Sequence, residues 1–155
     1  MFVMFRVPGP PVAKARPRVT THGTYTPRST RLYETKVRAA YMEQVGDVRF
    51  AQGAPVALKV LVFKTPPKSS SKAKRLQMLS GAIGAVQKPD WDNFGKIVSD
   101  ALNGAAWEDD AQVVNAQVVK LYGEEPGIWV LIADAELFAH EVTSARAMFA
   151  ACKGE

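Results

Sequence analysis

Residues 88–113 read KPDWDNFGKIVSDALNGAAWEDDAQV, and the middle of this segment has the periodicity of an amphipathic helix. At about 100° per residue, the apolar side chains between positions 92 and 103 share one face, namely Phe94, Ile97, Val98, Ala101 and Leu102. On the opposite face, Asp92, Lys96, Asp100 and Asn103 lie within about 80° of one another. Gly104 is a typical residue just after a helix. The segment therefore predicts a helix that packs through one face and presents charged groups on the other.

Strand-like segments lie on both sides of this helix. Residues 2–7 and 55–64 are rich in Val, Leu and Phe and are followed by prolines, which is typical of β-strands. Residues 112–122 and 128–133 are also rich in β-branched residues. The short connection between these last two segments predicts a β-hairpin.

Further helices are expected elsewhere in the chain. Residues 28–45, between Pro27 and Gly46, predict an amphipathic helix. Its expected packing residues are Leu32, Val37, Ala40 and Tyr41. Residues 12–27 predict a basic loop with one extended piece, and a short helix is expected to end near Leu79. A final helix is expected over residues 136–151, and its packing residues would be Leu137, Val142, Met148 and Phe149.

These elements predict an α+β (mixed α/β) fold, in which helices pack on a small mixed sheet. With 155 residues the chain fits one compact domain, since a domain of this size buries roughly 68–70% of its unfolded surface. We expect a single domain over residues 1–155. Residues 68–75 would form a basic insertion or arm, and residues 136–155 a C-terminal helical extension.

The charge is divided unevenly along the chain. Residues 1–88 hold 16 Lys and Arg against 3 Asp and Glu, a net charge of +13, whereas residues 89–155 hold 4 against 12, a net charge of −8. A basic half of this size favours binding to a polyanion such as nucleic acid. The candidate phosphate contacts are Lys14, Arg16, Arg18, Lys72, Lys74 and Arg75. For each of them taken alone, a solvated surface charge is the alternative.

Several classes of protein are excluded by composition. Cys152 is the sole cysteine and the sole histidines are His22 and His140, so an intrachain disulfide, a thiolate zinc site and an HExxH zinc site are all excluded. An enzyme with this sequence would rely on carboxylates and lysines. The longest apolar stretches are too short to span a bilayer. Residues 1–11 do not resemble a signal peptide, so we expect a cytoplasmic protein.

The acidic residues of the segment 88–113 can be interpreted in two ways. Asp90 and Asp92 flank the expected helix start, Lys96 lies one turn further on, and Asp110 precedes the next expected strand. If that strand lies beside the helix start, three carboxylates surround one point, as Mg²⁺ prefers. Alternatively, Asp90 or Asp92 caps the helix and Asp109 and Asp110 are turn residues. Spacing alone leaves both interpretations open.

Two tryptophans lie beside this acidic segment. Trp91 and Trp107 are each suited either to stacking on a nucleobase or to packing in the core. Their positions in the sequence do not distinguish between these roles.

The same residues resemble a known family. The runs KPDWDNFGK at residues 88–96, DALNG at residues 100–104 and WEDDAQV at residues 107–113 are similar to those of the RusA family of Holliday junction resolvases, which phages and prophages often carry. The VPGPP run at residues 7–11 and the Arg16-Pro17-Arg18 run fit the N-terminal strand and basic loop of that family. The Phe94-Gly95 pair within the expected helix, the lysine-rich residues 68–75 and the C-terminal extension depart from it.

The resemblance implies a homodimeric crossover junction endodeoxyribonuclease that depends on Mg²⁺, with Mn²⁺ as an alternative. Such an enzyme nicks two strands of a four-way DNA junction symmetrically during recombination or repair. Carried over by position, the catalytic and metal-binding acids would be Asp90, Asp92 and Asp110, and the catalytic lysine Lys96. Asp109 would have a secondary role in ordering the site, and the dimer interface would involve residues 112–122 or the final helix.

Two other functions are compatible with the residues. One is a catalytically silent, structure-selective DNA-binding module in which the aspartates are structural. The other is a nucleotide-sugar transferase that uses Asp90 and Asp92 as a D-x-D pair. The transferase is disfavoured because the chain lacks a glycine-rich phosphate loop and because a small substrate does not require a strongly basic half.

Overall fold

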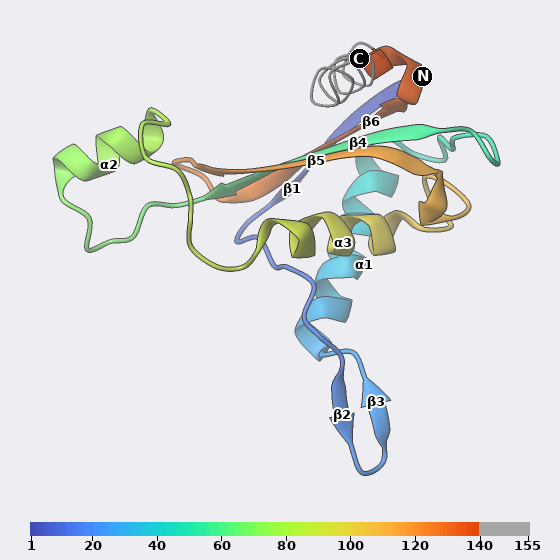
Figure 1. Cartoon of the computed structure of the whole chain (residues 1–155), viewed down its shortest axis with the longest axis horizontal. Helices are drawn as coiled ribbons and strands as arrows, with labels where there is room; N and C mark the ends of the chain where they lie inside the picture. Colours follow the sequence, from blue (N-terminus) through green and yellow to red (C-terminus); the bar gives the residue numbers. More distant parts are fainter. Residues whose placement is uncertain (140–155) are drawn as a thin grey trace, which may run out of the picture.

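One mixed sheet of four strands organises the chain (Figure 1), for which a computed structural model describes residues 1–139. The strands are β1 (Phe2–Pro8), β4 (Val56–Lys64), β5 (Val113–Tyr122) and β6 (Gly127–Asp134), in the spatial order β1-β6-β4-β5. β6 is antiparallel to both β1 and β4, whereas β5 is parallel to β4. The expected mixed sheet with packed helices is confirmed.

The hairpin predicted from residues 112–122 and 128–133 is wrong, because β4 lies between β5 and β6. Val60 of β4 is paired with Val118 on one side and with Val130 on the other. β4 is therefore a central strand that is hydrogen-bonded to β5 and to β6. The chain passes over the end of β4 on its way from β5 to β6. At this turn the Gly123 amide donates to the Lys64 carbonyl at 2.9 Å. A Cβ at Gly123 would lie 2.9 Å from the Phe63 ring, so any larger residue at this crossing would have to displace that ring.

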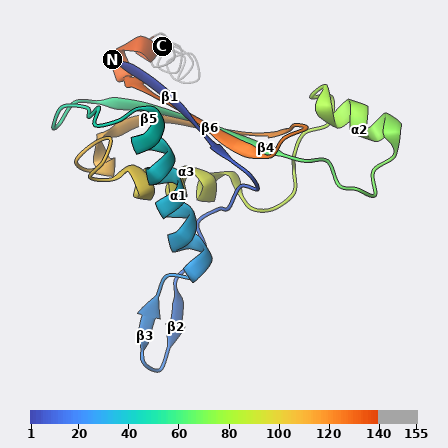
Figure 2. The same ribbon diagram turned by 180° about the vertical axis from the view of Figure 1, so that it is seen from behind.

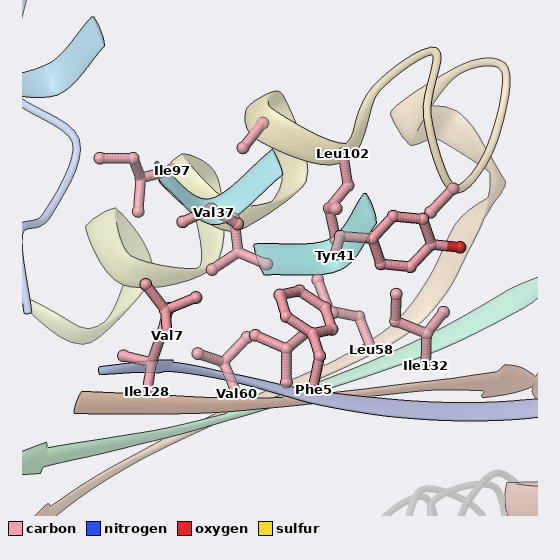
Figure 3. Close-up of a cluster of buried hydrophobic side chains, with 14 of the residues drawn as sticks. Phe5, Val7, Val37, Tyr41, Leu58, Val60, Ile97, Leu102, Ile128 and Ile132 are labelled. Atoms are coloured by element: carbon pink, nitrogen blue, oxygen red, sulfur yellow. The ribbon is translucent and has the colours of Figure 1, made fainter. Parts of the chain in front are cut away.

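Two helices, α1 (Arg28–Gln44) and α3 (Trp91–Leu102), cover one face of the sheet (Figures 1 and 2). Their buried side chains meet those of the strands in one core, which Figure 3 shows in close-up. The expected packing face of α3 is confirmed, since every residue assigned to it is at most 4% exposed. In α1 the bounds are close to those expected, but Leu32 is 58% exposed and the adjacent Tyr33 is buried instead.

Two basic elements project from this body (Figures 1 and 2). The first is a hairpin of β2 (Arg18–Thr20) and β3 (Gly23–Tyr25), where the sequence predicted a loop with one extended piece. The second is α2 (Lys72–Leu79), whose first turn is capped by the Ser71 side chain. Met78 of α2 packs with Ala85 and Tyr122 in a small cluster of its own.

The expected C-terminal helix lies almost entirely outside the described residues. Ala135–Phe138 form a short 3-10 helix after β6, and Leu137, which was expected to pack, is 57% exposed. Residues 140–155, including the other expected packing residues, are not described. Across residues 1–139, no helix combines the length and apolar character needed to cross a membrane.

Candidate active site

A pocket of about 250 Å³ lies between α3 and β5. Its apolar wall is formed by side chains of β4 and β5, including Leu58, Val113 and Val118. The charged residues that line it are Asp92, Lys96, Asp100 and Asp110. The pocket therefore combines an apolar floor with three carboxylates and one ammonium group.

The packing of α3 fixes the direction of its charged face. Because the opposite face of the helix is buried against the sheet and α1, Asp92, Lys96 and Asp100 are turned toward the pocket. Gly95 brings α3 close to β5, since a Cβ there would lie 3.2 Å from Cγ2 of Val118. Sequence analysis did not assign this role to Gly95, although a glycine inside a helix often marks a close approach of backbone.

Asp110 is placed by a short 3-10 helix, Asp110–Gln112, at the start of β5. The Asp109 side chain caps this helix by accepting from the Ala111 amide at 2.8 Å. The buried Gln112 side chain accepts from the Glu108 amide and donates to the carbonyls of Ala51 and Ala54. Asp109 is thus a structural cap, which agrees with the ordering role expected for it, and Asp110 is left exposed at the pocket.

Lys96 and Asp92 form an ion pair along α3, with 3.1 Å between Lys96 Nζ and Asp92 Oδ2. The Lys96 side chain is 62% exposed and that of Asp92 is 40% exposed. Pairs of this kind contribute little to stability because water screens them. The lysine can therefore exchange its carboxylate partner for a phosphate oxygen at small energetic cost.

Lys14 connects the N-terminal basic segment to the site. Its ammonium lies 2.5 Å from Asp100 Oδ2 and 2.5 Å from Glu34 Oε1, and its amide donates to the Asn93 carbonyl. Partial burial alone lowers the pKa of Lys14, but the hydrogen bonds and charges of Asp100 and Glu34 outweigh burial and raise it above 10.5. Lys14 thus fixes Asp100 on the pocket wall, and its expected contact with phosphate stays a prediction.

The structure brings together three of the four residues expected to be catalytic, namely Asp92, Lys96 and Asp110. Asp90 is the N-terminal cap residue of α3 and does not line the pocket, yet its side chain makes no capping hydrogen bond. Asp100, which the sequence left undecided, does line it. Trp91 is 62% exposed at the pocket, whereas Trp107 is fully buried, so Trp107 belongs to the core.

The other expected DNA contacts lie outside the pocket. Arg16 precedes the β2–β3 hairpin and is exposed, and Arg18 belongs to β2. Lys72, Lys74 and Arg75 are exposed on α2. The expected phosphate contacts are therefore distributed over both projections.

The donors of the pocket suit a hard divalent cation. Within residues 1–139, no three or more His, Cys, Asp or Glu side chains form a cage that could hold a metal ion. Mg²⁺ does not require such a cage, since it commonly uses one or two carboxylates together with water and substrate phosphates. Asp92 and Asp110, both accessible from one pocket, meet this requirement.

Comparison with known proteins agrees with this arrangement. The family model described as "Endodeoxyribonuclease RusA" matches residues 8–133, which include α1, β4, α3, β5, most of β6 and the pocket. The chain is also similar to "Uncharacterized protein YqaN" of Bacillus subtilis (strain 168), with 33% identity over 138 residues that cover 85% of this chain and 96% of that protein. The chain therefore belongs to the RusA family of Holliday junction endodeoxyribonucleases, enzymes that hydrolyse phosphodiester bonds of DNA.

Proposed function

We propose that this chain resolves four-way DNA junctions in the cytoplasm as a homodimer that depends on Mg²⁺ and makes paired, symmetric nicks. The observation that carries the proposal is the pocket between α3 and β5, where Asp92 and Asp110 from different elements meet Lys96. The nearby Asp90 would complete the acidic set. Mn²⁺ has similar ligand preferences and is expected to substitute.

Each residue of the pocket has a distinct part in this proposal. Asp92 and Asp110 would hold the cation, which when bound polarises the scissile phosphate and supplies an activated water. Lys96 would leave its pair with Asp92 and donate to a phosphate oxygen, where negative charge develops during in-line attack.

The basic residues outside the pocket would hold the arms of the junction. Lys72, Lys74 and Arg75 are exposed on the projecting helix α2, and Arg16 is exposed just before the β2–β3 hairpin, so they can reach phosphates that the pocket does not contact. Contacts of this kind supply affinity and position without reading sequence.

Dimerisation is proposed because a four-way junction has approximate two-fold symmetry, and an isologous pair presents two equivalent sites to it. β5 is an edge strand of the sheet, and its Val114 is 62% exposed, so this strand is available to a second copy. Sedimentation at micromolar concentration should give the dimer mass, and Val114→Asp should weaken association. A fully active monomer would contradict this part of the proposal.

The test is cleavage of an end-labelled four-way junction beside a linear duplex of the same sequence, with Mg²⁺ or with EDTA. We expect paired nicks on the junction alone, abolished by EDTA and by Asp92→Asn. Asp92→Asn should retain or improve junction binding because it removes a negative charge that faces phosphate. Asp47→Asn, in the turn after α1 and outside the pocket, is the matched control and should cleave normally.

The opposite result has a definite meaning. If the wild type binds the junction and cuts it with none of the divalent metals, the acidic residues are structural and the chain acts as a DNA-binding module. If Asp92→Asn cuts as fast as the wild type, Asp92 does not hold the cation.

A further inference from the structure

Two lysines that lie outside the pocket contact the segment that leads into α3. Lys120 of β5 donates through Nζ to the carbonyl oxygens of Gln87 at 2.7 Å and Pro89 at 2.9 Å. Lys64, at the end of β4, donates through Nζ to the carbonyl oxygen of Lys88 at 2.8 Å. Three successive carbonyls, directly before Asp90, are thus each bound by an ammonium group of the sheet.

These contacts hold the segment that precedes α3, where no side-chain cap does so. The cap residue Asp90 has extended backbone angles and makes no side-chain capping bond, so its own side chain does not hold the turn. Hydrogen bonds from a charged donor are stronger than bonds between neutral groups. The path of residues 87–89, and with it the position of Asp90 and Asp92, is therefore set by Lys120 and Lys64.

The placement of these two like charges supports a specific role. Lys120 pairs in register with Val62, two residues before Lys64, so the two side chains are diagonal neighbours on adjacent strands. Burial, followed by the charge of Lys120, lowers the pKa of Lys64 below its ordinary value. Two neighbouring ammonium groups repel each other, and the carbonyl oxygens between them and α3 offset this repulsion.

We propose that Lys120, assisted by Lys64, is a positioning residue that fixes the segment carrying Asp90 and Asp92 in the geometry needed to bind the divalent cation. This inference rests on the proposed metal-dependent function. Neither lysine contacts the substrate or the cation in this role. Each acts through the backbone of residues 87–89, at the junction between sheet and helix.

The test compares Lys120→Met and Lys64→Met with the wild type. Methionine preserves most of the length of the side chain and removes the donors. Lys36→Met is the matched control, since Lys36 Nζ also donates to a backbone carbonyl, that of Pro8, at the opposite edge of the sheet. Lys120→Arg, which retains charge and donors, is the conservative variant.

The first measurement is hydrogen–deuterium exchange of the metal-free protein. We expect the amides of residues 94–97, the first hydrogen-bonded amides of α3, to exchange about 10-fold faster in Lys120→Met, with a smaller increase in Lys64→Met and none in Lys36→Met. The second is the Mn²⁺ concentration that gives half-maximal junction cleavage. It should rise about 10- to 100-fold in Lys120→Met, as for loss of other groups that orient metal ligands. In Lys120→Met, the cleavage rate at saturating Mn²⁺ and the junction affinity in EDTA should change little. Lys120→Arg should recover part of the metal affinity that Lys120→Met loses.

The outcomes separate this inference from the proposed function. If the wild type cleaves and Lys120→Met shows the same Mn²⁺ dependence, the lysine does not position the site, and the proposed function stands. The same conclusion follows if exchange increases as much in Lys36→Met as in Lys120→Met. If the wild type neither binds Mn²⁺ in calorimetry nor cleaves, the proposed function itself fails, and the inference fails with it.

Discussion

The pocket between α3 and β5 and the two basic projections differ in how their charged side chains are supported. The pocket residues Asp92 and Lys96 stand on a helix whose other face is buried in the main core. Lys72, Lys74 and Arg75 stand on α2, where Met78 is the buried residue. The difference fits the task proposed for each region, because phosphodiester chemistry requires fixed geometry, whereas binding to a polyanion tolerates displacement of individual charges.

The largest effect is expected from Asp110→Asn. Cleavage should fall at least about 100-fold because the pocket loses a carboxylate of the proposed cation site, whereas junction affinity should be retained. Single-turnover cleavage rates and junction binding in EDTA measure the two properties separately.

The neighbouring aspartate supplies the control for this prediction. Asp109→Asn keeps an oxygen that can accept from the Ala111 amide, so the 3-10 helix and the cleavage rate should be preserved to within about 3-fold. Equal losses in Asp109→Asn and Asp110→Asn would show that the effect is structural.

A smaller effect is expected on the projections. Replacing Lys72, Lys74 and Arg75 together by alanine should reduce the slope of log affinity against log salt by up to about 2.7, if each contacts one phosphate. The cleavage rate at saturating protein should stay close to that of the wild type. Fluorescence anisotropy over a range of salt concentrations measures the slope, and Gln77→Ala on the same helix is the uncharged control.

If the triple variant retains the wild-type salt dependence, α2 does not contact DNA. A loss of the saturating cleavage rate would contradict the separation between the two regions. In that case α2 would contribute to the geometry of the site as well as to binding.

The smallest effect is expected on the stability of the protein, from substitution of Lys14, which joins the N-terminal basic segment to Asp100 of the pocket. Lys14→Met leaves Asp100 and Glu34 without their shared cation and should lower the free energy of unfolding by about 1–2 kcal/mol at pH 7. Because the pKa of Lys14 is raised in the folded state, its stabilisation is fully present below pH 10.5 and is lost as the pH rises through the folded-state pKa.

Urea unfolding of the wild type and Lys14→Met at pH 7 and pH 11 tests this dependence. The difference in unfolding free energy between the two proteins should narrow at pH 11. A difference that stays constant between these pH values would show that packing of the lysine stem, and not its charge, is what Lys14 contributes.

Local features of the fold could be predicted from the sequence, whereas pairing between distant segments could not. The α3 face was predictable because its period is contained within residues 92–103. The expected hairpin was wrong because the composition of β5 and β6 does not reveal that β4 lies between them. Leu32 and Tyr33 are adjacent apolar residues, and the packing of α1 on the sheet selects Tyr33 as the buried one.

The candidate site shows the same division. Asp92 and Lys96 share a helix face, so their proximity follows from spacing. Asp110 was expected beside them only on the condition that its strand lies next to the helix start, which spacing does not decide. The roles of Lys120 and Lys64 depend on carbonyl groups more than 20 residues away in sequence. A lysine at the end of a strand carries no local signal for such a contact, because solvated lysines are common at the same positions.

The arrangement of β4 and β5 has an evolutionary consequence. These strands are parallel neighbours, so everything between Lys64 and Val113 is an excursion that leaves the sheet at one end and returns at the other. The second half of this excursion carries α3 and the pocket, and its first half carries α2. Insertions or deletions between residues 65 and 86 would leave both strands and α3 in place. We therefore expect homologues to diverge in the length and charge of the first half, and so in which branched DNA they bind, while the half that carries the proposed site is inherited unchanged.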